Sequence, residues 1–205
     1  MNRTDVQTLI AEAAEWRLIA LLLERPRAGW QMEVAALARE VRQRPLRDAA
    51  YAARGASEGE YLHLIGPGGV VSPREVSYRS FEDPGRVLAD LAATYAAFAF
   101  QPRAEESLDH LAVEAGFVGY LLLKEAFAVA RGDREAATTT EAARSGFLEA
   151  HLTAARPFAE RLAASGSYLA AAARVLAERV PEHLARGAAG DGATDFTCSA
   201  CVPPS

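Results

Sequence analysis

The sequence predicts an all-α protein without a β-sheet, and three observations carry this prediction. Of the 205 residues, 45 are alanine, the strongest helix former, and half of the chain is apolar. The β-branched residues that favour strands are sparse. Apolar residues also recur at spacings of three and four, the period of a helix with one buried face. We therefore expect a helical bundle in two halves that are joined by a hinge loop.

The N-terminal half is expected to cover residues 1–98. A capping box, Thr4-x-x-Gln7, predicts a first helix over residues 4–24. Its buried stripe is formed by Leu9, Ala13, Trp16, Ala20 and Leu23. Further helices are predicted over 30–43, ending ahead of Pro45, over 57–65, and over 83–98, where Asp83-Pro84 supplies a cap and a first-turn proline. Residues 66–82, which begin with Gly66-Pro67-Gly68-Gly69, form a long loop without a period, and such loops are often functional.

The C-terminal half is expected to cover residues 107–186, after a hinge at 99–106. Ser107 is the expected cap of a helix to about residue 130, which Gly132 ends. A second capping box at Thr138 predicts a helix to about residue 164 with a kink at Pro157. Ser167 is expected to cap the last helix, to about residue 179. Residues 187–205 are rich in Gly, Ala, Asp and Pro and are expected to form a flexible tail.

The charge of the chain is unevenly spread. The net charge is −5, from 22 basic and 27 acidic residues. Residues 57–125 hold 5 basic and 11 acidic side chains, a balance of −6, whereas residues 1–56 carry 9 and 7, a balance of +2. The overall sign argues against a nucleic-acid binder with a basic surface. The acidic middle of the chain suits a cationic partner instead.

Several classes of protein are excluded or disfavoured by what the sequence lacks. The only cysteines, Cys198 and Cys201, lie in the last eight residues, so no disulfide framework is expected, and we predict neither a metal nor a cofactor. The apolar run at residues 18–23 is far shorter than the roughly 20 residues that span a bilayer. No catalytic signature is present. We therefore expect a cytoplasmic protein that is not an enzyme and does not insert stably into a membrane.

One polar segment carries the strongest functional signal. In it, Asp109-His110 is followed by Glu114, and the spacing of four places His110 and Glu114 on one helix face. Spacing alone is compatible with a charged helix start. The alternative is a polar cluster at the hinge that grips a cationic group of a ligand.

Taken in order, several segments resemble the TorD/DmsD/NarJ family of molybdoenzyme maturation chaperones. They are Tyr61-Leu62-His63-Leu64-Ile65, the loop Gly66-Pro67-Gly68-Gly69, Ser72-Pro73-Arg74-Glu75-Val76-Ser77-Tyr78, the motif Glu106-Ser107-Leu108-Asp109-His110 with Glu114, and Phe147-Leu148 with His151-Leu152 and then Pro157-x-Ala159. The likeness spans residues 61–159. It departs from the family pattern at Ser107, where the family has proline, and at Leu64-Ile65 in place of Leu-Phe.

The resemblance implies a chaperone without catalysis. Such proteins bind the N-terminal twin-arginine signal peptide and the apo form of the catalytic subunit of a molybdopterin oxidoreductase, assist cofactor insertion and delay export. The implied state is a monomer or a domain-swapped dimer. We assign Asp109, Glu114 and Glu75 as partners of the peptide's arginines and His110 as an orienting group. The apolar part of the peptide site is assigned to Tyr61, Leu64 and Tyr78.

The alternative hypothesis is an all-helical ligand-sensing or regulatory module. The four arginines Arg39, Arg42, Arg44 and Arg47 are the best case for a DNA-binding version of it. Their spacing, with Pro45 among them, is more typical of a helix end than of a recognition helix. We therefore prefer the chaperone and expect no nucleic-acid partner.

Overall fold

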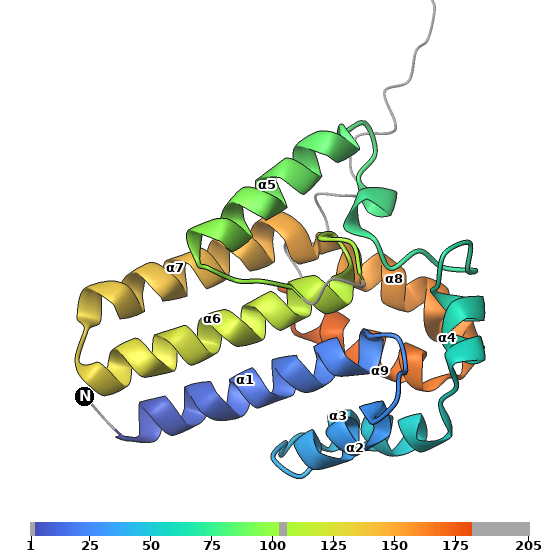
Figure 1. The fold of residues 1–205 in the computed structure, drawn as a ribbon, viewed down its shortest axis with the longest axis horizontal. Coiled ribbons are helices and arrows are strands. Elements are labelled where there is room, and N and C mark those ends of the chain that lie inside the picture. Colours follow the sequence, from blue (N-terminus) through green and yellow to red (C-terminus); the bar gives the residue numbers. More distant parts are fainter. Residues whose placement is uncertain (1–2, 103–105, 182–205) are drawn as a thin grey trace, which may run out of the picture.

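The computed structural model describes residues 3–102 and 106–181 and shows an all-α fold over them, which confirms the predicted class. Figure 1 shows α7, α6 and α1 side by side as a layer of long helices. The described residues form no strand, and their only β-type pairing is one isolated bridge. The α-helices are α1 (Arg3–Leu23), α2 (Trp30–Leu37), α3 (Arg44–Ala52), α4 (Glu58–Leu64), α5 (Pro84–Ala97), α6 (Leu111–Arg131), α7 (Arg134–His151), α8 (Ala155–Leu162) and α9 (Tyr168–Glu178), with a 3₁₀ turn η2 (Glu75–Tyr78) before α5.

The centre of the core is the antiparallel pair α1 and α6. Gly116 of α6 lies opposite Ala20, and Gly119 lies opposite Ala13 and Trp16. A Cβ atom at position 119 would lie 3.3 Å from the Ala13 carbonyl oxygen and from Trp16 Cβ, which is tighter than ordinary packing. Glycine at this position therefore allows the two helices to approach closely. The predicted stripe of α1 is buried from Ala13 onward.

α1 belongs to the predicted N-terminal half and α6 to the predicted C-terminal half, so the two halves share one core. The predicted hinge at 99–106 includes residues 103–105, which lie outside the described residues. The division into residues 1–98 and 107–186 stays a prediction.

Four predicted helix ends are confirmed by their capping bonds. The Ser57 hydroxyl accepts from the Glu60 amide, the Asp83 carboxylate from the Gly85 amide and the Ser167 hydroxyl from the Ala170 amide. Gly132 ends α6 in the left-handed conformation with φ 75°. Local side-chain chemistry therefore specifies these boundaries.

The prediction of one helix over residues 30–43 is wrong for residues 38–43. α2 ends at Leu37, and a separate helix, α3, begins at Arg44. Pro45 lies in the first turn of α3 instead of marking the end of a helix. A proline is tolerated there because the first amides of a helix have no partner within the helix.

Other predicted helix starts are displaced. α1 begins at Arg3, ahead of the predicted cap at Thr4. α6 begins at Leu111, and its N-cap is His110 instead of Ser107. α7 begins at Arg134, where the Asp133 side chain accepts from the Ala136 amide, so the predicted box at Thr138 lies inside the helix.

The continuous helix predicted from Thr138 to about residue 164 is interrupted. α7 ends at His151, a 3₁₀ turn covers Leu152–Ala154, and α8 begins at Ala155. Pro157 has no amide proton for the Thr153 carbonyl, and its ring crowds that carbonyl, so the break lies upstream of the proline. The predicted tail at 187–205 lies outside the described residues.

Candidate functional site

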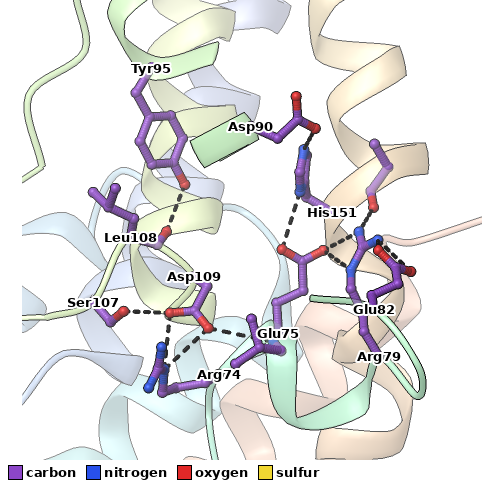
Figure 2. A network of polar contacts seen from close by, with 12 residues as sticks. Arg74, Glu75, Arg79, Glu82, Asp90, Tyr95, Ser107, Leu108, Asp109 and His151 are labelled. Carbon is purple, nitrogen blue, oxygen red and sulfur yellow. Dashed lines mark hydrogen bonds and ion pairs between the residues drawn. The ribbon is translucent and has the colours of Figure 1, made fainter. Parts of the chain in front are cut away.

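The loop at residues 66–82 is fastened by backbone pairing to the segment that leads into α6. The Glu75 amide donates to the Asp109 carbonyl at 2.8 Å, and the Leu111 amide donates to the Pro73 carbonyl at 3.0 Å. These bonds flank the isolated antiparallel bridge between Arg74 and His110. The predicted functional loop and the Asp-His motif therefore form a single junction, which Figure 2 shows with its polar side chains.

Asp109 lies at the centre of one half of this junction and has no exposed surface. Its carboxylate accepts from Arg74 Nε at 3.0 and 3.1 Å and from the Ser107 hydroxyl. One of its oxygens also lies 3.5 Å from the Val76 amide nitrogen. The Asp109 carboxylate is thus bonded on several sides by its own chain (Figure 2).

Glu75 occupies the other half and is also fully buried. It accepts from the Arg79 guanidinium, with the Nε bond at 2.8 Å, and its second oxygen lies 3.1 Å from His151 Nδ1. Arg79 also bonds Glu82 at 2.9 Å. On its other side, His151 Nε2 lies 3.6 Å from an Asp90 oxygen. This half of the junction joins the loop to α5 and to the end of α7 (Figure 2).

His110 caps α6 and is buried. Its Nδ1 accepts from the Ala112 amide at 3.1 Å, and its Nε2 lies 3.4 Å from the Tyr61 hydroxyl, which donates to Glu106 at 3.0 Å. Burial lowers the pKa of His110 from 6.5 to about 4, although Asp109 favours the charged form. The ring is therefore neutral near pH 7, and because Nδ1 accepts, its proton is on Nε2.

Glu114 is the unusual member of this region. Its carboxyl group is fully buried, and neither oxygen has a hydrogen-bond partner among the described residues. Burial raises its pKa well above the ordinary value, and the nearby carboxylates of Glu75 and Asp109 raise it further. Tyr95, whose hydroxyl donates to the Leu108 carbonyl, also has a raised pKa for the same reasons.

The structure thus brings together five of the seven predicted peptide-binding residues around the start of α6. The other two lie further along the loop region: Leu64 ends α4, and Tyr78 ends η2. The Tyr78 hydroxyl donates to the Ser72 carbonyl at 2.7 Å, and the Arg161 guanidinium lies 4.8 Å from its ring centre. Burial raises the pKa of Tyr78. Whether these seven residues contact a peptide stays a prediction.

A groove that the sequence analysis missed lies beside the junction, between α1, α6 and the segment at 98–102. Its volume is about 490 Å³. Its lining is mostly apolar and includes Phe100, Val113, Tyr120 and Leu123. Its charged residues are Glu24, Glu106, Arg17, Arg25 and Arg27. The signal in the sequence was a second apolar stripe on α6, formed by Gly116, Tyr120, Leu123 and Phe127. It lies opposite the buried stripe of Leu111, Ala115, Val118 and Leu122.

The comparison with protein families gives a match over residues 25–163 to the family described as the nitrate reductase delta subunit. The match covers most of the chain and contains both the loop at 66–82 and the Asp109-His110 motif. The chain belongs to this family. No match was found among curated proteins.

Membership in the delta-subunit family confirms the resemblance on which the sequence analysis relied. The chain is a molybdoenzyme maturation chaperone and not an enzyme. The choice between the two hypotheses is therefore settled against the ligand-sensing or regulatory module.

The remaining sequence predictions about this family member have mixed outcomes. His151, which belongs to the last segment of the resemblance, is buried, and its Nδ1 lies 3.1 Å from a Glu75 oxygen, so its polar group is satisfied within the core. Cys198 and Cys201 lie outside the described residues. Within the described part of the chain, no cluster of potential metal ligands is found and no helix is long and apolar enough to cross a membrane.

Proposed function

We propose that the chain acts in the cytoplasm by binding the N-terminal twin-arginine signal peptide of the catalytic subunit of a molybdopterin oxidoreductase. It holds the apo subunit until the cofactor has been inserted and thereby delays export. The observation that carries this proposal is the apolar groove between α1 and α6, with Glu106 of the family motif in its wall. As the chain belongs to a chaperone family, an open apolar groove is best explained as a site for a polypeptide.

The groove matches the apolar stretch of a signal peptide. Phe100 and Tyr120 offer aromatic surface, and Leu123 remains 52% exposed although it lies on the central helix of the core. The exposed part of this leucine side chain gives a favourable hydrophobic free energy only when another apolar surface covers it. The apolar stretch of the peptide supplies that surface.

The charged end of the groove is balanced by pairs within the chain. Three arginines line this end, and each has a carboxylate partner. Arg17 bonds Glu24 at 2.6 Å, Arg25 Nε donates to Glu58 at 2.8 Å, and Arg27 bonds Glu33 at 2.6 Å. Glu106 adds a further carboxylate in the groove wall, with 21% of its side chain exposed. Because its carboxylate oxygens accept from donors such as the Tyr61 hydroxyl, they are held in place for an incoming guanidinium.

The three carboxylates assigned from the sequence have a different position. Glu75, Asp109 and Glu114 are fully buried, and the first two already bond Arg79 and Arg74. A peptide arginine reaches Asp109 or Glu75 only by displacing those guanidinium groups. We therefore propose Glu106 as the first arginine partner in the groove, and the direct contacts of the other three stay predictions.

The proposal is tested by titrating a synthetic peptide that has two consecutive arginines followed by an apolar stretch of leucine and alanine. We expect Glu106→Gln to weaken binding about tenfold, the effect of one charge-assisted contact. Leu123→Glu, which places a charge in the groove, is expected to weaken it at least as much. The matched control is Met32→Glu, at a residue of α2 that is 75% exposed and does not line the groove.

Two outcomes would contradict parts of this proposal. If the wild type, Glu106→Gln and Leu123→Glu bind the peptide with equal affinity, the groove is not the peptide-binding site. A larger loss with Asp109→Asn and Glu114→Gln, in variants whose stability is unchanged, would instead favour the arginine partners assigned from the sequence. A peptide with glutamines in place of both arginines shows whether the charge is recognised at all. Light scattering during size-exclusion chromatography distinguishes the predicted monomer from the domain-swapped dimer.

A further inference from the structure

α2, α3 and the turn between them carry a basic surface that the proposed function does not use. Between residues 39 and 54 the chain has five arginines against two acidic residues, a local balance of +3 in a chain of −5. All five side chains are exposed. They are Arg39, Arg42, Arg44, Arg47 and Arg54. None of them lines the groove between α1 and α6.

Four of these five arginines have no acidic partner among the described residues. Arg44 has Asp48 at 3.6 Å. For Arg39, Arg42, Arg47 and Arg54, no carboxylate of the described residues lies within ion-pair distance. Other exposed arginines, such as Arg86 and Arg134, also lack an ion pair among the described residues, so what distinguishes Arg39, Arg47 and Arg54 is that they line one hollow. The guanidinium groups of Arg39, Arg47 and Arg54 therefore remain available for carboxylates or phosphates of a partner.

The three arginines surround one hollow. It has a volume of about 210 Å³ and lies between α2 and α3. Val34 and several alanines give it an apolar lining, and Arg39, Arg47 and Arg54 belong to it together with Tyr51. Tyr51 is 67% exposed, and the Arg54 guanidinium lies 4.6 Å from the centre of its ring. This geometry combines an apolar recess with three cationic groups.

We propose that this surface is a docking site for an acidic segment of a partner polypeptide. One apolar side chain of the segment enters the hollow, and carboxylates on either side of it bond Arg39, Arg47 and Arg54. The charges are complementary, and the arginine fork matches the geometry of a carboxylate. The site lies apart from the groove, so a partner protein can occupy both at once.

The dimensions and charges favour a polypeptide over other anions. The volume is below the roughly 300 Å³ at which pockets for small-molecule ligands begin. A nucleic-acid duplex carries a charge about every 1.7 Å and would extend beyond three arginines onto a chain that is negative overall. A flat bilayer surface would leave the hollow unfilled. A short acidic segment with one apolar side chain meets all three conditions.

The test uses the full chain and a fluorescein-labelled peptide in which a leucine has two glutamates on each side. Fluorescence anisotropy at low salt should show saturable binding. The triple variant Arg39→Gln, Arg47→Gln, Arg54→Gln should bind about tenfold more weakly or worse, the sum of three exposed charge pairs. The matched control is the triple variant Arg42→Gln, Arg86→Gln, Arg134→Gln, which removes the same charge from exposed positions outside the hollow.

The outcomes separate this proposal from its alternatives. Loss of affinity in the first triple variant but not in the second supports the docking site. Absence of binding, or equal losses in both variants, overturns it. Tighter binding of a DNA or RNA duplex, or of vesicles with anionic lipid, lost in the same first variant, overturns the polypeptide partner in favour of that anion. Replacing the central leucine by glycine should weaken binding if the hollow is occupied. The twin-arginine peptide titration is independent of all these outcomes.

Discussion

The junction between the 66–82 loop and α6 and the groove beside it are neighbours with opposite character. In the junction, the carboxylates of Glu75 and Asp109 are fully buried and bonded to arginines of the same chain. The groove between α1 and α6, in contrast, is open and is lined mostly by apolar side chains. The charged residues of the sequence motif therefore hold the loop against α6. The surface that a partner can reach is formed by apolar residues that stand outside the motif.

The largest expected effect tests the structural role of the junction. Glu75→Ala leaves Arg79 and His151 without their buried partner. We expect the free energy of unfolding to fall by about 3 kcal/mol, as when one member of a buried ion pair is removed. Urea denaturation followed by circular dichroism measures the change.

The matched control for this substitution is Glu82→Ala. Glu82 bonds the same Arg79, but half of its side chain is exposed, so the loss should stay below about 1 kcal/mol. Comparable losses for the two variants would mean that burial does not distinguish the junction from its surface.

The next effect concerns the pH dependence of stability at Glu114. The folded state holds the Glu114 proton more tightly than the unfolded chain does, because the pKa is raised on folding. Above the ordinary pKa of 4.5, the folded state therefore binds more protons, and stability falls as the pH rises towards the raised pKa. Glu114→Gln stays neutral at every pH. Its free energy of unfolding should therefore rise relative to that of the wild type by up to about 1.4 kcal/mol per pH unit in that interval.

Denaturation curves at a series of pH values between 5 and 8 measure this difference, and a constant difference would contradict it. His110 gives a control of opposite sign. Its pKa is lowered from 6.5 to about 4, so the unfolded chain takes up the proton first, and stability is lost as the pH falls through that range. His110→Asn keeps a good N-cap and should remove this second dependence.

The smallest effect compares two glycines of α6 on the groove side. A Cβ at Gly116 would lie 3.8 Å from Ala20 Cβ, an ordinary contact, so Gly116→Ala should stabilise the chain by about 0.5–1 kcal/mol. Gly119→Ala should gain less or lose stability, because its Cβ would lie 3.3 Å from α1. Thermal unfolding measures both variants, and equal shifts would show that the helices are not closely packed at Gly119.

The fold could be predicted where local side-chain chemistry decides it. Asp83-Pro84 gave a correct helix start because the Asp83 side chain caps the helix. Pro45 was misread because Gln43 caps α3 without any side-chain bond, which leaves no local signal. The start of α6 was misplaced because the Ser107 hydroxyl bonds the Asp109 side chain two residues on, and His110 is the cap instead.

The site could be predicted as a place in the chain but not as a set of contacts. The motif and the loop do meet, as the assignment of Glu75 and Asp109 to one site requires. The acidic balance of residues 57–125, however, includes Glu75, Asp109 and Glu114, which are buried. A charge count cannot show that Arg74 and Arg79 face two of them, because those pairs depend on the fold of the loop.

The antiparallel pairing of α1 with α6 also has a consequence for the synthesis of the chain. Trp16 lies against Gly119, so its final partner is made about a hundred residues later, or roughly 5–20 s at the usual rate of translation. Until then, the face of α1 that α6 will cover stays open to solvent and to other chains. A maturation chaperone is thus itself exposed at its own first helix while it leaves the ribosome.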